Sequence, residues 1–169
     1  MKLISIEIKA RVENLGATRK ILKARGAIFK GVDIQTDTYF KVGQGRLKLR
    51  EGKIENALIY YNRENKSGPK QSDVSLIAIN PLLKKALFRS LDVLVIVRKR
   101  REIYFINNVK FNLDKVRGLG NFVEIEAISK DGVIGKKKLR EQCEYFLGLL
   151  RISKKDLVPV SYSDLLLRR

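Results

Sequence analysis

Charged side chains recur at every second position in several short stretches of this sequence. Residues 5–11 carry Glu7, Lys9 and Arg11, with aliphatic residues between them. The same spacing returns in later stretches, whose alternate charged residues are Arg46, Lys48, Arg50, Lys99, Arg101, Lys110, Asp114, Glu124 and Glu126. Because side chains alternate between the two faces of a β-strand, each stretch would gather its charges on one face. Cations converging with a few carboxylates are the groups that bind a polyphosphate and its metal ion.

Two residue types are scarce, and this restricts the chemistry. The chain has no histidine and a single cysteine, Cys143, which excludes the commonest general base and an internal disulfide. We expect Cys143 to lie on the buried stripe of a helix. Any metal ion would be a hard cation on carboxylates, Mg²⁺ or Mn²⁺.

The net charge indicates an anionic partner. The 169 residues include 36 Lys and Arg against 18 Asp and Glu, a formal net charge of +18. Nucleotides, polyphosphates, nucleic acids and anionic membranes all fit this excess. The basic run at 98–101 could bind nucleic acid weakly, but in a strand only Arg98 and Arg100 would face solvent. The lysines at 136–138 are expected on a solvated helix face.

Length and composition predict one globular domain over residues 1–169, with 44% hydrophobic residues. No apolar stretch reaches the roughly 20 residues that span a bilayer, and no signal-peptide pattern opens the chain. We therefore expect a cytoplasmic protein without a membrane partner. Heavy use of Lys, Glu and Ile with little Cys, Met or His is compatible with a thermophilic source.

Turn residues and periodicity predict mostly strands with a few helices. We expect strands at 3–12, 31–41, 46–51, 57–63, 73–79, 92–101, 102–107, 109–116 and 122–129. Helices are expected at 13–25, after Asn80-Pro81, at 135–151 and from Ser161 onward, and an exposed loop at 64–70.

Strands joined mainly by hairpins indicate an antiparallel sheet with one aliphatic and one charged face. For a single strand, a flat sheet with its charged face in water is the simpler interpretation. Repetition over five strands favours closure into a barrel, which would place the charges inside and the helices against the aliphatic exterior.

Four segments, in order, resemble the CYTH superfamily of triphosphate tunnel metalloenzymes, specifically its class IV adenylate cyclase (CyaB-type) branch. SIEIKARV at 5–12 resembles the N-terminal ExExK strand, and QTDTYF with GRLKLRE, within 35–51, resembles the second and third strands. VRKRREIYF and VKFNLDKVRGLGNFVEIEAI, within 97–128, resemble the second half of the tunnel. VPVSYSDLLL at 158–167 resembles the SYxxLL ending. The match covers essentially the full length.

This resemblance implies an α+β fold, a closed eight-stranded antiparallel tunnel around a triphosphate, with helices packed outside. The implied phosphate-binding residues are Lys9, Arg11, Arg46, Lys48, Arg50, Arg63, Lys99, Arg101 and Lys110. The implied ligands of Mg²⁺ or Mn²⁺ are Glu7, Asp114, Glu124 and Glu126, and the implied catalytic residues are Glu7, Lys9 and Arg50.

Three positions depart from the family pattern. Ser5 replaces the first Glu of ExExK, Asn62 stands where the branch often has lysine, and Ser75 lies in a strand that tends to carry carboxylates. One metal-binding wall of the tunnel would therefore have lost carboxylates. The chain would be either an enzyme with one well-bound metal or a paralogue that binds triphosphates without turnover.

We expect metal-dependent hydrolysis of a nucleoside triphosphate or tripolyphosphate. The first alternative is class IV adenylate cyclase activity, which makes cyclic AMP and pyrophosphate from ATP. The second is a non-catalytic module that binds triphosphate, polyphosphate or RNA through the +18 charge. A homodimer is compatible with each.

Overall fold

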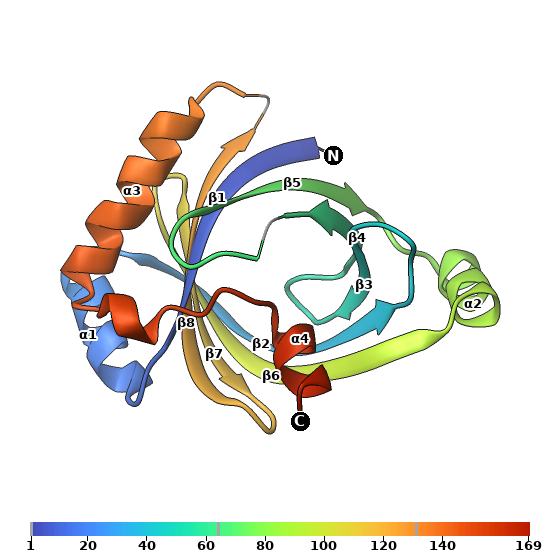
Figure 1. Ribbon diagram of the computed structural model, residues 1–169. Coiled ribbons are helices and arrows are strands. Elements are labelled where there is room, and N and C mark those ends of the chain that lie inside the picture. The colour runs from blue at the N-terminus through green and yellow to red at the C-terminus, as the bar shows by residue number, and fades with distance from the viewer. Residues whose placement is uncertain (1, 64, 131) are drawn as a thin grey trace.

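Eight antiparallel strands close into a barrel (Figure 1). The computed structural model describes residues 2–63, 65–130 and 132–169. The order around the barrel is β1, β5, β4, β3, β2, β6, β7, β8. Their bounds are β1 Lys2–Arg11, β2 Ile28–Phe40, β3 Arg46–Glu51, β4 Ala57–Asn62, β5 Lys70–Ile77, β6 Val93–Ile106, β7 Val109–Val116 and β8 Gly120–Lys130. The closed eight-stranded α+β barrel predicted from the sequence is confirmed.

Two predicted segments need correction. β6 is one unbroken strand, so the separate strands predicted at 92–101 and 102–107 are wrong. The register of β6 with β7 continues without a shift from Lys99 to Ile106, because β7 offers backbone partners on both sides of the predicted break. The predicted loop at 64–70 ends earlier than expected: Glu64 lies outside the described residues, and Lys70 is a buried residue of β5 opposite Glu7.

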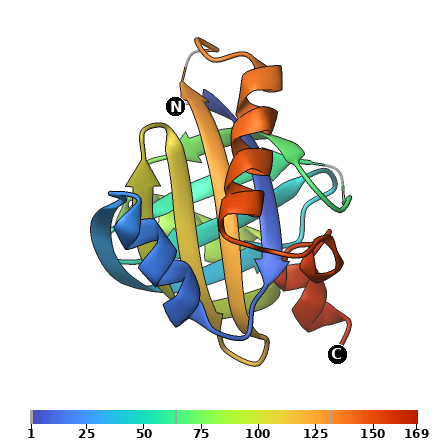
Figure 2. The ribbon, with the colours of Figure 1, turned by 90° about the vertical axis from the view of Figure 1, so that its left-hand side faces the viewer.

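Three helices cover the outside of the barrel. α3 (Lys136–Leu149) lies over β1 and β8, and α1 (Leu15–Ala24) lies on the other side of β8 from β1 (Figure 2). The apolar residues between them and the strands form the largest core, in which Cys143 is buried with a free thiol, as predicted. α2 (Pro81–Ser90) begins after the Asn80 cap and packs against a smaller core around Phe40 and Leu49.

The fourth helix lies at one end of the barrel and contributes a side chain to its interior. α4 (Tyr162–Leu167) follows a 3-10 turn (Lys154–Asp156) and begins with a capping box between Ser161 and Asp164. Tyr162 packs with Val97 and Phe122, whose side chains point inward from β6 and β8. The prediction of helices packed outside the barrel is confirmed, and α4 lies at one end of the barrel beside β6 (Figure 1).

Within the described ranges, no helix combines the length and the apolar character needed to cross a bilayer.

Candidate functional site

A cavity of about 510 Å³ occupies the interior of the barrel, within the range of roughly 300–1,000 Å³ common for small-molecule sites. It is lined by the inner faces of the strands, the β3–β4 loop and the start of α4. The charged lining residues are the cations Lys9, Lys48, Arg50, Arg63, Arg101, Lys110 and Lys130 and the acids Glu7, Glu55, Glu124 and Glu126. The interior therefore carries more positive than negative charge.

Most of the residues implied by the family resemblance meet in this cavity. Those that line it are Glu7, Lys9, Lys48, Arg50, Arg63, Arg101, Lys110, Glu124 and Glu126. They converge because period-2 alternation turns each charged set inward once the sheet closes. Arg98, Arg100 and the lysines at 136–138 are exposed, as expected from the same alternation.

Four other predicted residues do not line the cavity. Lys99 and Asp114 are buried and contact lining residues or their partners. Arg46 lies near α4, where its Nη2 donates to Asp164 Oδ2 at 3.0 Å. Arg11 is exposed: its Nη1 donates to the Leu119 carbonyl at 2.6 Å and its guanidinium stacks over a phenylalanine ring.

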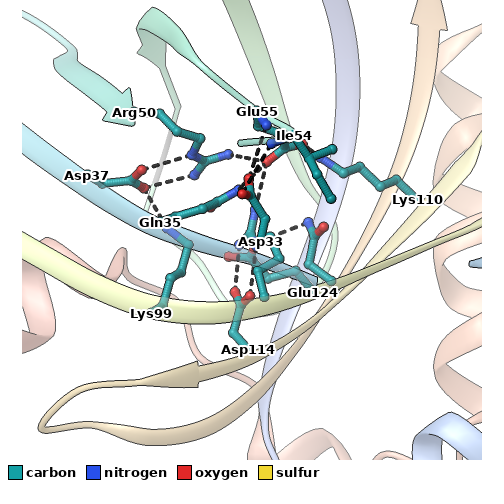
Figure 3. A network of polar contacts seen from close by, with 12 residues as sticks. Asp33, Gln35, Asp37, Arg50, Ile54, Glu55, Lys99, Lys110, Asp114 and Glu124 are labelled. Carbon is teal, nitrogen blue, oxygen red and sulfur yellow. Dashed lines mark hydrogen bonds and ion pairs between the residues drawn. The ribbon is translucent and has the colours of Figure 1, made fainter. Parts of the chain in front are cut away.

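Asp37 holds three predicted phosphate-binding residues together, of which Figure 3 shows Arg50 and Lys99. Arg50 donates to both Asp37 carboxylate oxygens at 2.8 Å. Lys48 and Lys99 approach Oδ2 at 3.2 and 2.7 Å. Burial alone would raise the pKa of Asp37, but the three cations outweigh it and hold the pKa well below its usual range. Asp37 is therefore an anion that pre-assembles a cationic cluster.

Arg101 forms a second cluster with two of the predicted metal ligands. Its guanidinium contacts Asp114 in bidentate geometry, at 2.7 and 2.5 Å, and Glu124 at 2.7 Å. Lys9 Nζ lies 3.2 Å from Glu124 and 3.9 Å from the centre of the Tyr162 ring. The Tyr162 hydroxyl donates to Asp114 at 2.8 Å, which fastens α4 to the interior.

Glu7 and Lys70 form the wall between β1 and β5. Arg63 makes an ion pair with Glu7. Lys70 Nζ donates to the Val158 carbonyl at 3.0 Å. Burial, reinforced by repulsion from Arg63, lowers the pKa of Lys70 to about 7.

Glu55 enters the cavity from the β3–β4 loop. Its carboxylate accepts hydrogen bonds from Arg50 at 2.9 Å and Gln35 at 2.8 Å, and pairs with Lys110. Burial alone would raise its pKa, but the surrounding cations lower the pKa well below the usual range for glutamate. Glu55 is ionised at neutral pH and neutralises part of the cationic interior.

The carboxylates suit a hard divalent cation in type, but they are not preassembled. Glu7 and Glu126 are direct cross-strand neighbours, and Glu124 lies two residues away on the same inward face. Among the described residues, no three acidic side chains converge as a ready metal site, and Glu7 and Glu124 are each paired with a cation. Since Mg²⁺ is commonly held by one or two carboxylates plus substrate phosphates, this donor set fits a metal that arrives with a phosphate ligand.

Of the three departures, only Ser5 lies on the inward face. Ser5 is buried opposite Ser72, and the hydroxyl oxygens of both lack a hydrogen-bond partner within the described residues. Asn62 is exposed, and the cavity-lining residues of β5 are Ser72, Val74 and Leu76 rather than Ser75. The cavity-facing side of β5 does lack a carboxylate, but the residues responsible are Ser72, Val74 and Leu76 rather than Ser75.

Sequence reasoning missed Glu55, which lines the cavity, and two charged residues buried beside the cavity, Asp37 and Lys70. Asp37 belongs to an alternating set with Gln35 and Tyr39, a signal that could have placed it inside. Lys70 was assigned to a loop. The inward direction of Glu55 had no periodic signal because it lies between strands.

The two ends of the cavity differ in character. Ser161 and Tyr162 line the end of the cavity where α4 begins. At the same end, Lys9 Nζ donates to the Val160 carbonyl. Apolar residues line the part around the start of β1 and the β3–β4 loop: Leu3, Ile54, Val74, Leu76, Phe105 and Ile128.

Comparison with known proteins places this architecture in a family. The CYTH domain model matches residues 3–162. A Methanocaldococcus jannaschii protein named "Putative adenylate cyclase" is 26% identical over 174 residues, covering 96% of this chain and 98% of the relative. A solved Pyrococcus horikoshii structure has a TM-score of 0.75 with 25% identity and covers 95% of this chain and 98% of that one. A Hippeastrum structure described as a "putative adenylyl cyclase" with a dominant triphosphatase activity has a TM-score of 0.63 with 15% identity, covering 96% and 94% of the chains. The family match over nearly the whole chain shows that this protein belongs to the CYTH domain family.

Proposed function

We propose that this chain hydrolyses a triphosphate, nucleoside or inorganic, held in the cavity with Mg²⁺ or Mn²⁺. The observation that carries the proposal is the enclosed interior with seven Lys or Arg and four Glu side chains. A triphosphate chain supplies negative charge along its length, which matches cations distributed over several strands. Phosphoryl transfer is accelerated mainly by positioning and charge neutralisation. Lys, Arg and Glu side chains are the residue types that this chemistry needs.

The proposed role of each residue follows from its position in the cavity. Arg50, Arg101 and Lys110 line the cavity around Glu55. Lys9 lines it beside Glu124, and Arg63 beside Glu7. Arginine offers a bidentate grip on phosphate oxygens, whereas lysine acts as a point charge. Lys99 would act through the Asp37 cluster rather than by direct contact.

Glu7, Glu124 and Glu126 would hold the divalent cation, with Asp114 behind them orienting Arg101. A bound divalent cation supplies charge neutralisation at the phosphates. Lys9 and Arg50 are the catalytic residues that we propose to contact the reacting phosphate, and Glu7 would act on it through the divalent cation.

Hydrolysis requires that the phosphate chain be held and that a water molecule attack a phosphorus atom, and it needs no fixed nucleoside. Cyclisation also requires the ribose 3′-hydroxyl to be directed at the α-phosphorus, and hence a fixed nucleoside. Side chains such as Leu3, Ile54 and Phe105 can pack against an organic group without reading a particular base. The adenylate cyclase named among the relatives makes cyclisation of ATP the second candidate.

Product identification decides between these reactions. The protein would be incubated with ATP or with tripolyphosphate, plus Mg²⁺ or Mn²⁺, and the products separated by chromatography. We expect orthophosphate from both substrates. Cyclic AMP with pyrophosphate would establish cyclisation, and binding without any product, together with steeply salt-dependent RNA binding, would establish a non-catalytic module.

A further inference from the structure

The β3–β4 loop, residues 52–56, is held in a fixed position by a buried carboxylate. Asp33 Oδ1 accepts the backbone amides of Lys53 and Ile54 at 2.8 and 3.2 Å, and Oδ2 accepts that of Glu55 at 3.0 Å. Asp33 is fully buried on β2. A carboxylate that accepts three backbone N–H groups fixes the path of the loop without any contribution from the Glu55 side chain.

The sequence of the loop suits this close approach. A Cβ at Gly52 would clash with the Asp33 carboxylate, so only glycine lets the chain pass so near. Lys53, Ile54 and Asn56 are exposed, whereas the Glu55 carboxylate is directed to the cations of the interior (Figure 3). The loop therefore has a backbone held in place by Asp33 and one acidic side chain directed into the cavity.

The surroundings of the Glu55 carboxylate are those of a bound anion. Arg50 Nη1 and Gln35 Nε2 donate to Oε2 at 2.9 and 2.8 Å, Lys110 pairs with Oε1, and Arg101 Nη1 lies 3.8 Å away. Three cations and an amide around two oxygens would serve a phosphate group equally well. Arg50, Arg101 and Lys110 are also residues that the proposed function assigns to phosphate.

We propose that Glu55 is a specificity-determining residue: its carboxylate occupies a phosphate position, and a polyphosphate must displace it to bind. The inference rests on the proposed function only in taking polyphosphate as the ligand. A carboxylate and a phosphate cannot share this position, since like charges a few ångströms apart repel strongly in a poorly solvated site. The exposed neighbours of Glu55 leave solvent within reach of its displaced side chain.

This competition selects for highly charged ligands. Orthophosphate gains contacts at one position only, and there it meets Glu55. A tripolyphosphate also contacts cations beyond the reach of Glu55, such as Lys9 and Arg63, and these contacts offset the loss of the Glu55 contacts. Glu55 would thus disfavour single phosphates, including a released product.

The test is calorimetric titration of orthophosphate and tripolyphosphate in metal-free buffer with wild type, Glu55→Gln and Glu51→Gln. Glu51 is a matched control, because it is a glutamate of β3 paired with Lys84 of α2, outside the cavity. Removing a competing charge-assisted contact should tighten tripolyphosphate binding to Glu55→Gln roughly tenfold and make orthophosphate binding measurable. The control should match wild type.

A thermal-melting series guards against a folding effect. Glu55→Gln leaves buried cations unneutralised, so its melting temperature should fall without ligand and recover with tripolyphosphate, giving a larger ligand-induced shift than in wild type. Equal or weaker tripolyphosphate binding by Glu55→Gln, or an equal shift, would overturn the inference. These measurements need no turnover. Tighter tripolyphosphate binding by Glu55→Gln, together with an inactive wild type, would therefore overturn the proposed function but not this inference. An active wild type, together with unchanged tripolyphosphate affinity in Glu55→Gln, would overturn this inference but not the proposed function.

Discussion

Glu7 of β1 and Glu126 of β8 lie directly opposite each other and line the same cavity. Directly opposed residues of an antiparallel pair have Cβ atoms about 4.5–5.5 Å apart, and two like charges at that distance repel each other. Arg63 pairs with Glu7, whereas Glu126 makes no hydrogen bond or ion pair within the described part of the chain. This pair is the best-placed part of the donor set for a divalent cation.

Metal binding should depend on the phosphate ligand. We expect Mn²⁺ to bind weakly alone and at least tenfold more tightly with tripolyphosphate, because two carboxylates plus phosphate oxygens complete the coordination. Electron paramagnetic resonance of free Mn²⁺ measures both affinities. Activity should disappear with EDTA, and full turnover in metal-free buffer would contradict the proposed chemistry.

Glu126→Gln should remove most turnover while weakening triphosphate binding less. The substitution deletes one ligand charge and keeps the shape of the side chain, so the loss should fall mainly on kcat. Steady-state kinetics with tripolyphosphate and Mg²⁺ measure it, with Glu144→Gln on α3 as an exposed control. Wild-type rates in Glu126→Gln would remove this residue from the site.

Arg50→Ala should cost far more triphosphate affinity than Arg100→Ala. Arg50 lines the cavity, and a charge-assisted contact is worth about 1.5–3 kcal/mol, or roughly 10- to 100-fold in affinity. Arg100 is exposed on β6 and pairs with Glu102, so its removal should change affinity less than twofold. Isothermal titration of both variants provides the comparison, and equal losses would show that the outer surface binds the ligand.

Ser5→Glu should restore a carboxylate on the inward face of β1. Ser5 and Glu7 are two residues apart on one face, so the new acid should tighten metal binding and raise the rate of a slow enzyme. The opposite result, repulsion of substrate phosphates, would appear as a higher KM. Ser75→Glu on the outward face of β5 is the control. An unchanged metal affinity and rate in Ser5→Glu would place Ser5 outside the site.

Stability should rise between pH 7 and about pH 10 because of the buried lysines. Burial lowers the pKa of Lys70 and of Lys99 to about 7, whereas the unfolded value is near 10.4. The unfolded chain therefore binds more protons in this window, and the free energy of unfolding increases with pH. Melting temperatures of wild type and Lys70→Met test this, since the variant should lose part of the slope. A flat wild-type profile would contradict the lowered pKa values.

The sequence by itself determined which side chains point inward. Strict alternation in 46–51 and 97–101 separates Lys48, Arg50 and Arg101 from the outward-facing Arg98 and Arg100, and the burial pattern agrees. This inference succeeds because alternation is a local property of an extended backbone, fixed by covalent geometry. Closure was also foreseeable, because the same aliphatic and charged faces repeat over several strands, and a barrel lets helices cover the aliphatic exterior.

Only the tertiary structure decided which charges pair. Asp37 contacts Lys99 across 62 positions of sequence, and Lys110 reaches Glu55 across 55. Such contacts depend on register and on the path of loops, which carry no periodic signal. The packing of Tyr162 inside the barrel also depends on the path of the chain before α4. The continuity of β6, predicted as two strands, depends on its pairing with neighbouring strands. Long-range pairing is set when the barrel closes, and the local sequence does not encode it.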